Sequence, residues 1–263
     1  MSRVDSKTNA ILPSFQVLGL RVNAVQMPEV VNLMEHWILA GRDCHFIAVT
    51  NVHVVMEAQR DGSFKKVMAA AHLIVPDGMP LVWLGRLRGH SLHRRVCGPE
   101  LLIEFCRQTH AKSYGHFFLG GSPGIPEKVA VCLRKQFPGM RIQGTHSPPF
   151  RSLSVEEDDS IVRMINDVAP DILWVGLGCP KQERWIYEHY DRLKVPVIVG
   201  VGQAFDLCAG QTHRAPQWMR EHGFEWLFRL IRDPRRLWRR YLIYNSQFLY
   251  CLLLELFKLR QFE

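Results

Sequence analysis

The sequence predicts an α/β fold with a parallel β-sheet and a basic, helical C-terminal appendage. Short runs of β-branched and aromatic residues alternate with segments that have the periodicity of amphipathic helices, which is typical of parallel strands joined by helices. Polar and glycine residues follow several of these expected strands. From residue 223 the chain becomes aromatic and rich in arginine, with helical spacing.

Strands and helices are expected to alternate between residues 15 and 205. The expected strands are 15–22, 45–51, 72–77, 116–121, 140–146, 171–178 and 195–205. The expected helices are 27–40, 52–71, 79–88, 98–110, 122–137, 154–168 and 180–193. We therefore divide the chain into a flexible tail (1–14), a core domain (15–222) and the appendage (223–263).

Composition narrows the classes of function. The chain has 263 residues and a formal net charge of +8, which favours an anionic partner such as a phosphorylated ligand, a membrane surface or a nucleic acid. Its seven cysteines form no CxxC pair, so neither a disulfide framework nor a zinc site is expected. The sequence shows no secretory signal and no apolar run of about 20 residues, the length that spans a membrane.

Candidate site residues gather where the expected strands end. Ligands of open parallel sheets bind beyond the carboxyl ends of the strands, so these residues are expected to meet. The Gly-Gly turn after strand 116–121 suits either a phosphate or a tight turn without a ligand. The strand-end residues are Thr50, Asn51, Asp77, Gly120, Gly121, Gly178 and Gln203.

Several of these residues have two interpretations. Asp77 suits a general base at a strand end, and equally a helix cap or an Asx turn. Thr50 and Asn51 are better explained as caps of the following helix. Glu183, in the first turn of an expected helix, can serve the helix dipole alone, whereas Gln182 beside it is a stronger candidate for a contact at the site mouth.

The appendage also has alternatives. Its arginines suit a membrane surface, a diphosphate or single-stranded RNA, and equally a solvated face or a docking helix. No RNP, KH or helix-turn-helix signature supports a nucleic-acid partner. The arginines are Arg229, Arg232, Arg235, Arg236, Arg239 and Arg240, interleaved with Trp226, Phe228, Trp238 and Tyr241.

Six stretches together resemble the WecG/TagA/CpsF family of bacterial glycosyltransferases. They occur in the family's order and cover roughly residues 17 to 250. The stretches are TNVHVV (50–55), IVPDGMPLVW (74–83), FFLGGSPG (117–124), PDILWVGLGCPKQERWI (170–186), GVGQAFDLCAG (200–210) and RAPQWMREHGFEWLFRLIRDPRRLWRRYL (214–242).

The resemblance implies a Rossmann-like core whose C-terminal appendage completes the active site. The implied activity is an inverting transfer of a sugar from a UDP-sugar to a polyprenyl-diphosphate-linked saccharide, for a cell-surface polysaccharide. The implied place is the cytoplasmic face of the plasma membrane, with peripheral attachment. The resemblance is compatible with a homo-oligomer. We expect no nucleic-acid partner. The alternative is a non-catalytic protein that binds UDP-sugars or nucleic acid.

The resemblance also assigns roles to residues. The family's proposed base falls on Asp77, and Thr50 and Gln182 match its other catalytic positions. Arg229, Arg236 and Arg239 match the arginines of the appendage. These three arginines belong to the expected substrate-binding set. Its other members are Asn51, Gly120, Gly121, Gly178, Glu183 and Gln203.

No cofactor is expected. The sequence has no DxD-type acidic pair near a strand end, and its histidine pairs lack acidic or cysteine companions, so we expect catalysis without a metal. Pro80 and Gln203 stand where many members have glycine, and Thr50 and Asn51 are adjacent where some members have a residue between them. These departures leave the donor sugar open among N-acetylmannosamine, its uronic acid and glucose.

Overall fold

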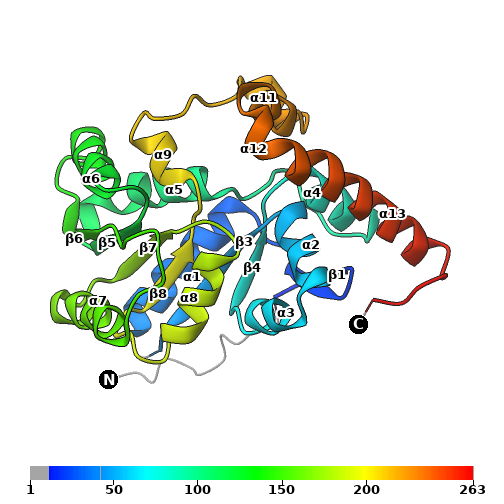
Figure 1. Ribbon diagram of the computed structural model, residues 1–263. Helices are drawn as coiled ribbons and strands as arrows, with labels where there is room; N and C mark the ends of the chain where they lie inside the picture. The colour runs from blue at the N-terminus through cyan, green and yellow to red at the C-terminus, as the bar shows by residue number, and fades with distance from the viewer. Residues whose placement is uncertain (1–11, 42, 263) are drawn as a thin grey trace, which may run out of the picture.

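A six-stranded parallel sheet forms the centre of the protein (Figure 1), as the sequence predicts. The computed structural model describes residues 12–41 and 43–262. The strand order across the sheet is β4-β3-β8-β7-β5-β6, and each neighbouring pair is parallel. The strands are β3 (His45–Thr50), β4 (Leu73–Pro76), β5 (Gly115–Gly120), β6 (Arg141–His146), β7 (Ile172–Gly176) and β8 (Val197–Gly200).

Helices cover both faces of this sheet. Successive residues of a strand point to opposite faces, so Phe46 and Ala48 join one apolar layer while Ile47 and Val49 join the other. One layer includes α2 (Val52–Arg60), α3 (Gly62–Ala69), α4 (Met79–Leu87), α7 (Val155–Val168) and α8 (Lys181–His189). The other includes α1 (Met27–Ala40), α5 (Gly98–Thr109), α6 (Ile125–Gln136) and α9 (Ala204–Cys208), and the short turn η1 (His110–Lys112) follows α5.

Three expected elements are wrong in detail. The expected strand 15–22 is an antiparallel hairpin of β1 (Ser14–Val17) and β2 (Leu20–Asn23), because the chain turns at Leu18 and Gly19 with positive φ. Expected helix 52–71 breaks at Asp61, whose carboxylate accepts hydrogen bonds from the first amides of α3. Expected strand 195–205 ends at Gly200, and α9 follows it.

The C-terminal region is helical, as the sequence predicts. It consists of α10 (Gln217–Glu221), α11 (Glu225–Arg232), α12 (Pro234–Trp238), the π-helical turn η2 (Arg239–Ile243) and α13 (Tyr244–Leu256). Figure 1 shows α11 and α12 above one end of the sheet and α13 running past α2 and α4 to the edge of the molecule. No helix of the described residues combines the length and apolar character needed to cross a membrane.

Several contacts attach α13 to the core, including an ion pair of 3.1 Å between Glu255 and Arg88. Phe248 is buried in the apolar layer that contains α2, and the Tyr244 hydroxyl donates to Glu57 Oε1 over 2.6 Å. Residues 1–11 of the expected tail lie outside the described residues, and Ser14 at its end already belongs to β1. The boundary at residue 223 stays a prediction.

Candidate active site

Most of the strand-end residues meet at one cavity, which we call the sheet-end cavity. It lies where β3, β4, β7 and β8 finish, and the appendage contributes two arginines to its wall. Its polar lining consists of Asn51, Asp77, Gly178, Gln182, Glu183, Gln203, Arg229 and Arg240.

A second cavity, the appendage cavity, opens between the core and the C-terminal helices. The core supplies His53, Asp77, Met79, Pro80 and Arg95 among its lining residues, and the appendage supplies Glu225, Trp226, Arg229, Arg240, Tyr241 and Asn245. Both cavities share Asn51, Asp77, Pro99, Arg229 and Arg240. Asp77 therefore borders two adjoining spaces at once.

Backbone geometry places Asp77 at this junction. β4 ends at Pro76, and the Asp77 amide donates to the Thr50 carbonyl over 2.6 Å, which extends the pairing of β3 and β4 by one bond. The N-cap of α4 is Gly78, with φ 122°, so Asp77 does not cap that helix. Its carboxylate instead accepts a 3.4 Å hydrogen bond from Asn51 Nδ2 and lies 4.0 Å from Arg95 Nη1.

The charges around Asp77 oppose one another. Burial raises the pKa of Asp77 above its ordinary value, the guanidinium of Arg95 lowers it, and the carboxylate of Glu225 raises it. The net result is a raised pKa, the direction that suits a general base.

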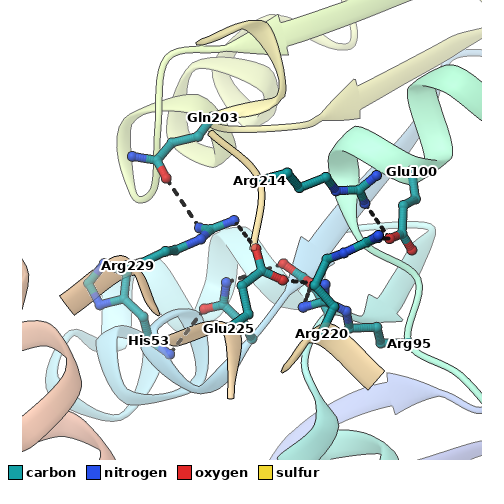
Figure 2. A network of polar contacts seen from close by, with 10 residues as sticks. His53, Arg95, Glu100, Gln203, Arg214, Arg220, Glu225 and Arg229 are labelled. Atoms are coloured by element: carbon teal, nitrogen blue, oxygen red, sulfur yellow. Dashed lines mark hydrogen bonds and ion pairs between the residues drawn. The ribbon is translucent and has the colours of Figure 1, made fainter. Parts of the chain in front are cut away.

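Glu225 holds two of the arginines in place. Figure 2 shows its carboxylate between Arg95, from the core, and Arg229, from α11. The Glu225–Arg229 contact is 2.5 Å, and Arg229 Nη1 also donates to Gln203 Oε1 over 3.2 Å. This network connects the appendage to the ends of the core strands, and it aligns Arg229 at the border of both cavities.

Gln182 connects two loops of the site. Its Oε1 accepts hydrogen bonds from the amides of Gly178 (3.2 Å) and Gly202 (3.0 Å), which follow β7 and β8. Its Nε2 donates to Glu183 Oε1 over 2.8 Å. Gln182 and Glu183 are 3% and 1% exposed, so neither is a surface residue that merely faces the helix dipole. Burial raises the pKa of Glu183.

The expected site glycines have different structural reasons for lacking a side chain. A Cβ at Gly120 would stand 2.6 Å from the Gly176 backbone, and one at Gly121 would stand 3.1 Å from Ile125. Chain packing at the β5 turn thus restricts both glycines. Neither lines the sheet-end or the appendage cavity, and Gly121 lines a separate pocket beside α7 and α8. A Cβ at Gly178 would meet open space, because this glycine lines the sheet-end cavity.

The structure does not bring every expected residue to the site. Thr50 is buried and donates to the Ala48 carbonyl over 3.4 Å, away from both cavities. Asn51 caps α2, as the capping interpretation predicted, and also contacts Asp77. Arg236 pairs with Asp233 over 2.5 Å beside a neighbouring pocket. Arg239 is exposed and lies over the Trp238 ring.

Three charged residues of the site are missing from the expected set: Arg95, Glu225 and Arg240. Arg95 lies in the irregular loop between α4 and α5, which carries no strand-end signal. Arg240 lines the cavity in place of its neighbour Arg239, and both residues belong to the π-helical turn η2. In an α-helix of 3.6 residues per turn, residues five apart point in directions roughly 140° apart, whereas a π-helical turn brings them to one face. Arg240 and Asn245 accordingly line the same cavity.

Within residues 12–41 and 43–262, His, Cys, Asp and Glu side chains form no group of three or more that is arranged to hold a metal ion.

Comparison with known proteins shows the family to which the chain belongs. The chain matches the description "Glycosyl transferase WecG/TagA/CpsF family" over residues 15–262. It is 29% identical to a Staphylococcus aureus (strain MW2) protein over 237 residues, 90% of this chain and 91% of that protein. It is 29% identical to a Bacillus spizizenii protein over 197 residues, 75% of this chain and 74% of that one. Both are named N-acetylglucosaminyldiphosphoundecaprenol N-acetyl-beta-D-mannosaminyltransferase. The chain therefore belongs to the WecG/TagA/CpsF family of glycosyltransferases.

Proposed function

We propose that this protein transfers N-acetylmannosamine, with inversion, from a UDP-sugar to an N-acetylglucosamine that is linked through diphosphate to a polyprenol. The names of the relatives support the transferred sugar and the acceptor. The observation that carries the proposal is the position of Asp77, a carboxylate with a raised pKa on the border of two adjoining cavities. A base that serves a transfer between two bound sugars must contact such a junction.

In the proposed reaction Asp77 removes the proton from the acceptor hydroxyl. The hydroxyl oxygen attacks the anomeric carbon from the face opposite UDP, the new carbon–oxygen bond forms, and UDP leaves with the electron pair of the old one. General-base catalysis of this kind contributes about 10²–10⁴-fold.

The appendage arginines would neutralise the leaving diphosphate. Arg229 and Arg240 both line the sheet-end cavity, and Arg236 lies beside a neighbouring pocket that Arg229 and Gln203 share. Guanidinium groups bind phosphate oxygens through charge-assisted hydrogen bonds. We therefore propose that the reaction needs no metal ion, so that turnover should persist in EDTA.

A lipid-linked acceptor places the reaction at a membrane surface. We propose that the protein attaches peripherally to the cytoplasmic face of the plasma membrane through its appendage. The net charge of +8 supports this, because each arginine near an anionic surface contributes about 1 kcal/mol. The exposed side chains of Leu249, Tyr250, Leu253 and Leu256 in α13 support it as well.

Asp77→Asn tests the assignment of the base. The variant should lose at least about 10²-fold in UDP release with a diphosphate-linked N-acetylglucosamine acceptor and UDP-N-acetylmannosamine, while its UDP affinity stays unchanged. Wild-type turnover in this variant would refute the role of Asp77. A wild-type protein that binds UDP-sugars without releasing UDP would instead support the binding-only alternative.

Folding should not confound this test. Because burial raises the pKa of Asp77, the fold disfavours its ionised form, and stability is lost as pH rises through the folded-state pKa. Asparagine removes that cost, so the Tm of Asp77→Asn at neutral pH should not fall below that of the wild type. Thermal unfolding with a panel of UDP-sugars then identifies the donor, since the ligand that binds most tightly raises the Tm most.

A further inference from the structure

The proposed reaction makes no use of Glu183, an acid of the sheet-end cavity. Glutamate in the first turn of a helix usually remains solvated and complements the helix dipole. Glu183 lies in the first turn of α8 but is only 1% exposed, and it lines the same cavity as Asp77. Stabilisation of the helix dipole does not require a buried glutamate. The burial of Glu183 in this cavity therefore needs a different explanation.

Hydrogen bonding fixes the orientation of the Glu183 carboxyl group. The Oε1 atom of Gln182 accepts from two backbone amides, which determines that its Nε2 is the atom facing Glu183. This Nε2 donates to Glu183 Oε1 over 2.8 Å. The other oxygen, Oε2, is buried and has no hydrogen-bond partner within the described residues.

A second unsatisfied group lines the same cavity. Arg240 Nε is buried and likewise lacks a partner among the described residues. Buried polar atoms are nearly always hydrogen-bonded in folded proteins, so two such atoms in one cavity require partners with oxygen atoms, which a bound ligand or water supplies.

The surroundings of Glu183 favour its uncharged form. No cation of the described residues lies within ion-pair distance of it. Burial raises its pKa. The Gln182 amide, the backbone amide of Glu183, the Cys179 thiol and the more distant Arg240 oppose this rise only in part. Because Oε1 already accepts from Gln182, the proton of the uncharged acid belongs on Oε2.

We propose that Glu183 donates a hydrogen bond from Oε2 to a sugar oxygen of the bound UDP-sugar and thereby contributes to recognition of the donor. The inference rests on the proposed function and names a residue that selects its substrate. A hydroxyl or acetamido oxygen of the sugar is neutral and suits an uncharged donor, whereas the arginines of the cavity suit the charged diphosphate. Sites that hydrogen-bond a substrate oxygen discriminate strongly against analogues that lack it.

Two variants of Glu183 separate the possible roles. Glu183→Gln keeps an acceptor oxygen for Gln182 and replaces the O–H donor with an N–H donor. Glu183→Met removes both the acceptor and the donor but keeps a side chain of similar size. Calorimetry should measure the Kd of UDP-N-acetylmannosamine and of UDP alone for each. We expect Glu183→Gln to stay within about threefold of the wild type for both ligands, and Glu183→Met to weaken donor binding about tenfold with little change for UDP.

Each other outcome overturns the inference. If Glu183→Gln is as impaired as Glu183→Met, the ionised carboxylate is required. If Glu183→Met weakens UDP as much as the donor, Glu183 contacts the diphosphate or acts by supporting Gln182 and its loops. Unchanged donor binding in Glu183→Met excludes any contact with the sugar. In all three cases a wild type that transfers the sugar keeps the proposed function intact, whereas a wild type that transfers none contradicts that function itself.

Discussion

Of the two cations that lower the pKa of Asp77, Arg95 has the larger influence and Arg229 the smaller one. A general base must be ionised to accept a proton, so activity should fall as pH decreases through the folded-state pKa of Asp77. Burial raises that pKa above the ordinary value of 3.8, and Arg95 is the largest influence that lowers it. The position of the acidic limb of the pH–rate profile therefore reports on Arg95.

Arg95→Met should move this limb to higher pH. The substitution removes the stronger of the two positive charges that favour the Asp77 carboxylate. It leaves Arg229, the weaker one, and Glu225, which disfavours the carboxylate. The measurement is kcat/KM against pH for UDP release. Arg95→Lys, which keeps the charge, is the matched control and should remain close to the wild type. An acidic limb that stays in place in Arg95→Met would show that Asp77 does not control the pH dependence.

At the level of the elements, the glycines at the ends of the strands are needed for two different reasons, close packing and an open cavity. Gly120 and Gly178 both have positive φ, at 121° and 79°. A Cβ at Gly120 would stand 2.6 Å from the Gly176 backbone, which cannot move without separating β5 from β7. A Cβ at Gly178 would enter the open cavity.

Alanine substitutions at these two glycines should therefore differ in cost. Gly178→Ala should lower the free energy of unfolding by about 1–2 kcal/mol, the cost of a left-handed conformation for a residue with a Cβ. Gly120→Ala adds a clash between the new Cβ and the Gly176 backbone, so it should lower the free energy of unfolding clearly more. Urea denaturation measures both, and equal losses would contradict the packing explanation for Gly120.

In the π-helical turn η2, Arg240 faces the two cavities and its neighbour Arg239 does not. Motif position assigned Arg239 to the site, but Arg240 lines both cavities and Arg239 lies over Trp238 at the surface. A charge-assisted hydrogen bond is typically worth about 1.5–3 kcal/mol. Arg240→Met should thus lower kcat/KM about tenfold or more, and Arg239→Met should lower it clearly less. A larger loss in Arg239→Met would show that the motif assignment is correct and that η2 changes its register when substrate binds.

At the scale of the whole molecule, the sequence predicted the architecture better than the site. Strand and helix periodicity is a local property, and it located the six parallel strands and the sheet edge where Asp77, Gly178 and Gln203 meet. The Asp61 break and the Leu18–Gly19 turn were missed, because an Asp cap and a short turn leave the apolar pattern of their surroundings intact.

The missing site residues are those whose placement depends on tertiary contacts. Arg95 and Glu225 are 130 residues apart in sequence and meet only when the appendage packs on the core. Likewise, no local sequence pattern distinguishes Arg240 from Arg239, and only the folded chain shows which of the two lines the cavities. The resemblance to a known family supplied Arg229 by motif position, and the structure places it at both cavities.

The appendage has two separable parts, one at the cavities and one at the far end of α13. Its α11 and η2 residues line the cavities, and Phe248 anchors α13 to the core. Beyond that anchor, Leu253 and Leu256 are 52% and 74% exposed and line neither cavity. Attachment to a membrane should accordingly depend on these leucines, while the chemistry does not.

The double variant Leu253→Ser/Leu256→Ser should separate attachment from catalysis. Fully burying a leucine is worth about 1.5–3 kcal/mol, so losing two partly inserted ones should weaken sedimentation with phosphatidylglycerol-containing vesicles about tenfold or more. Turnover of a water-soluble, short-chain acceptor should stay unchanged. Leu39→Ser/Val131→Ser, which removes two exposed apolar residues from α1 and α6, is the matched control and should sediment like the wild type. Equal vesicle binding by both double variants would locate the membrane contact away from the end of α13.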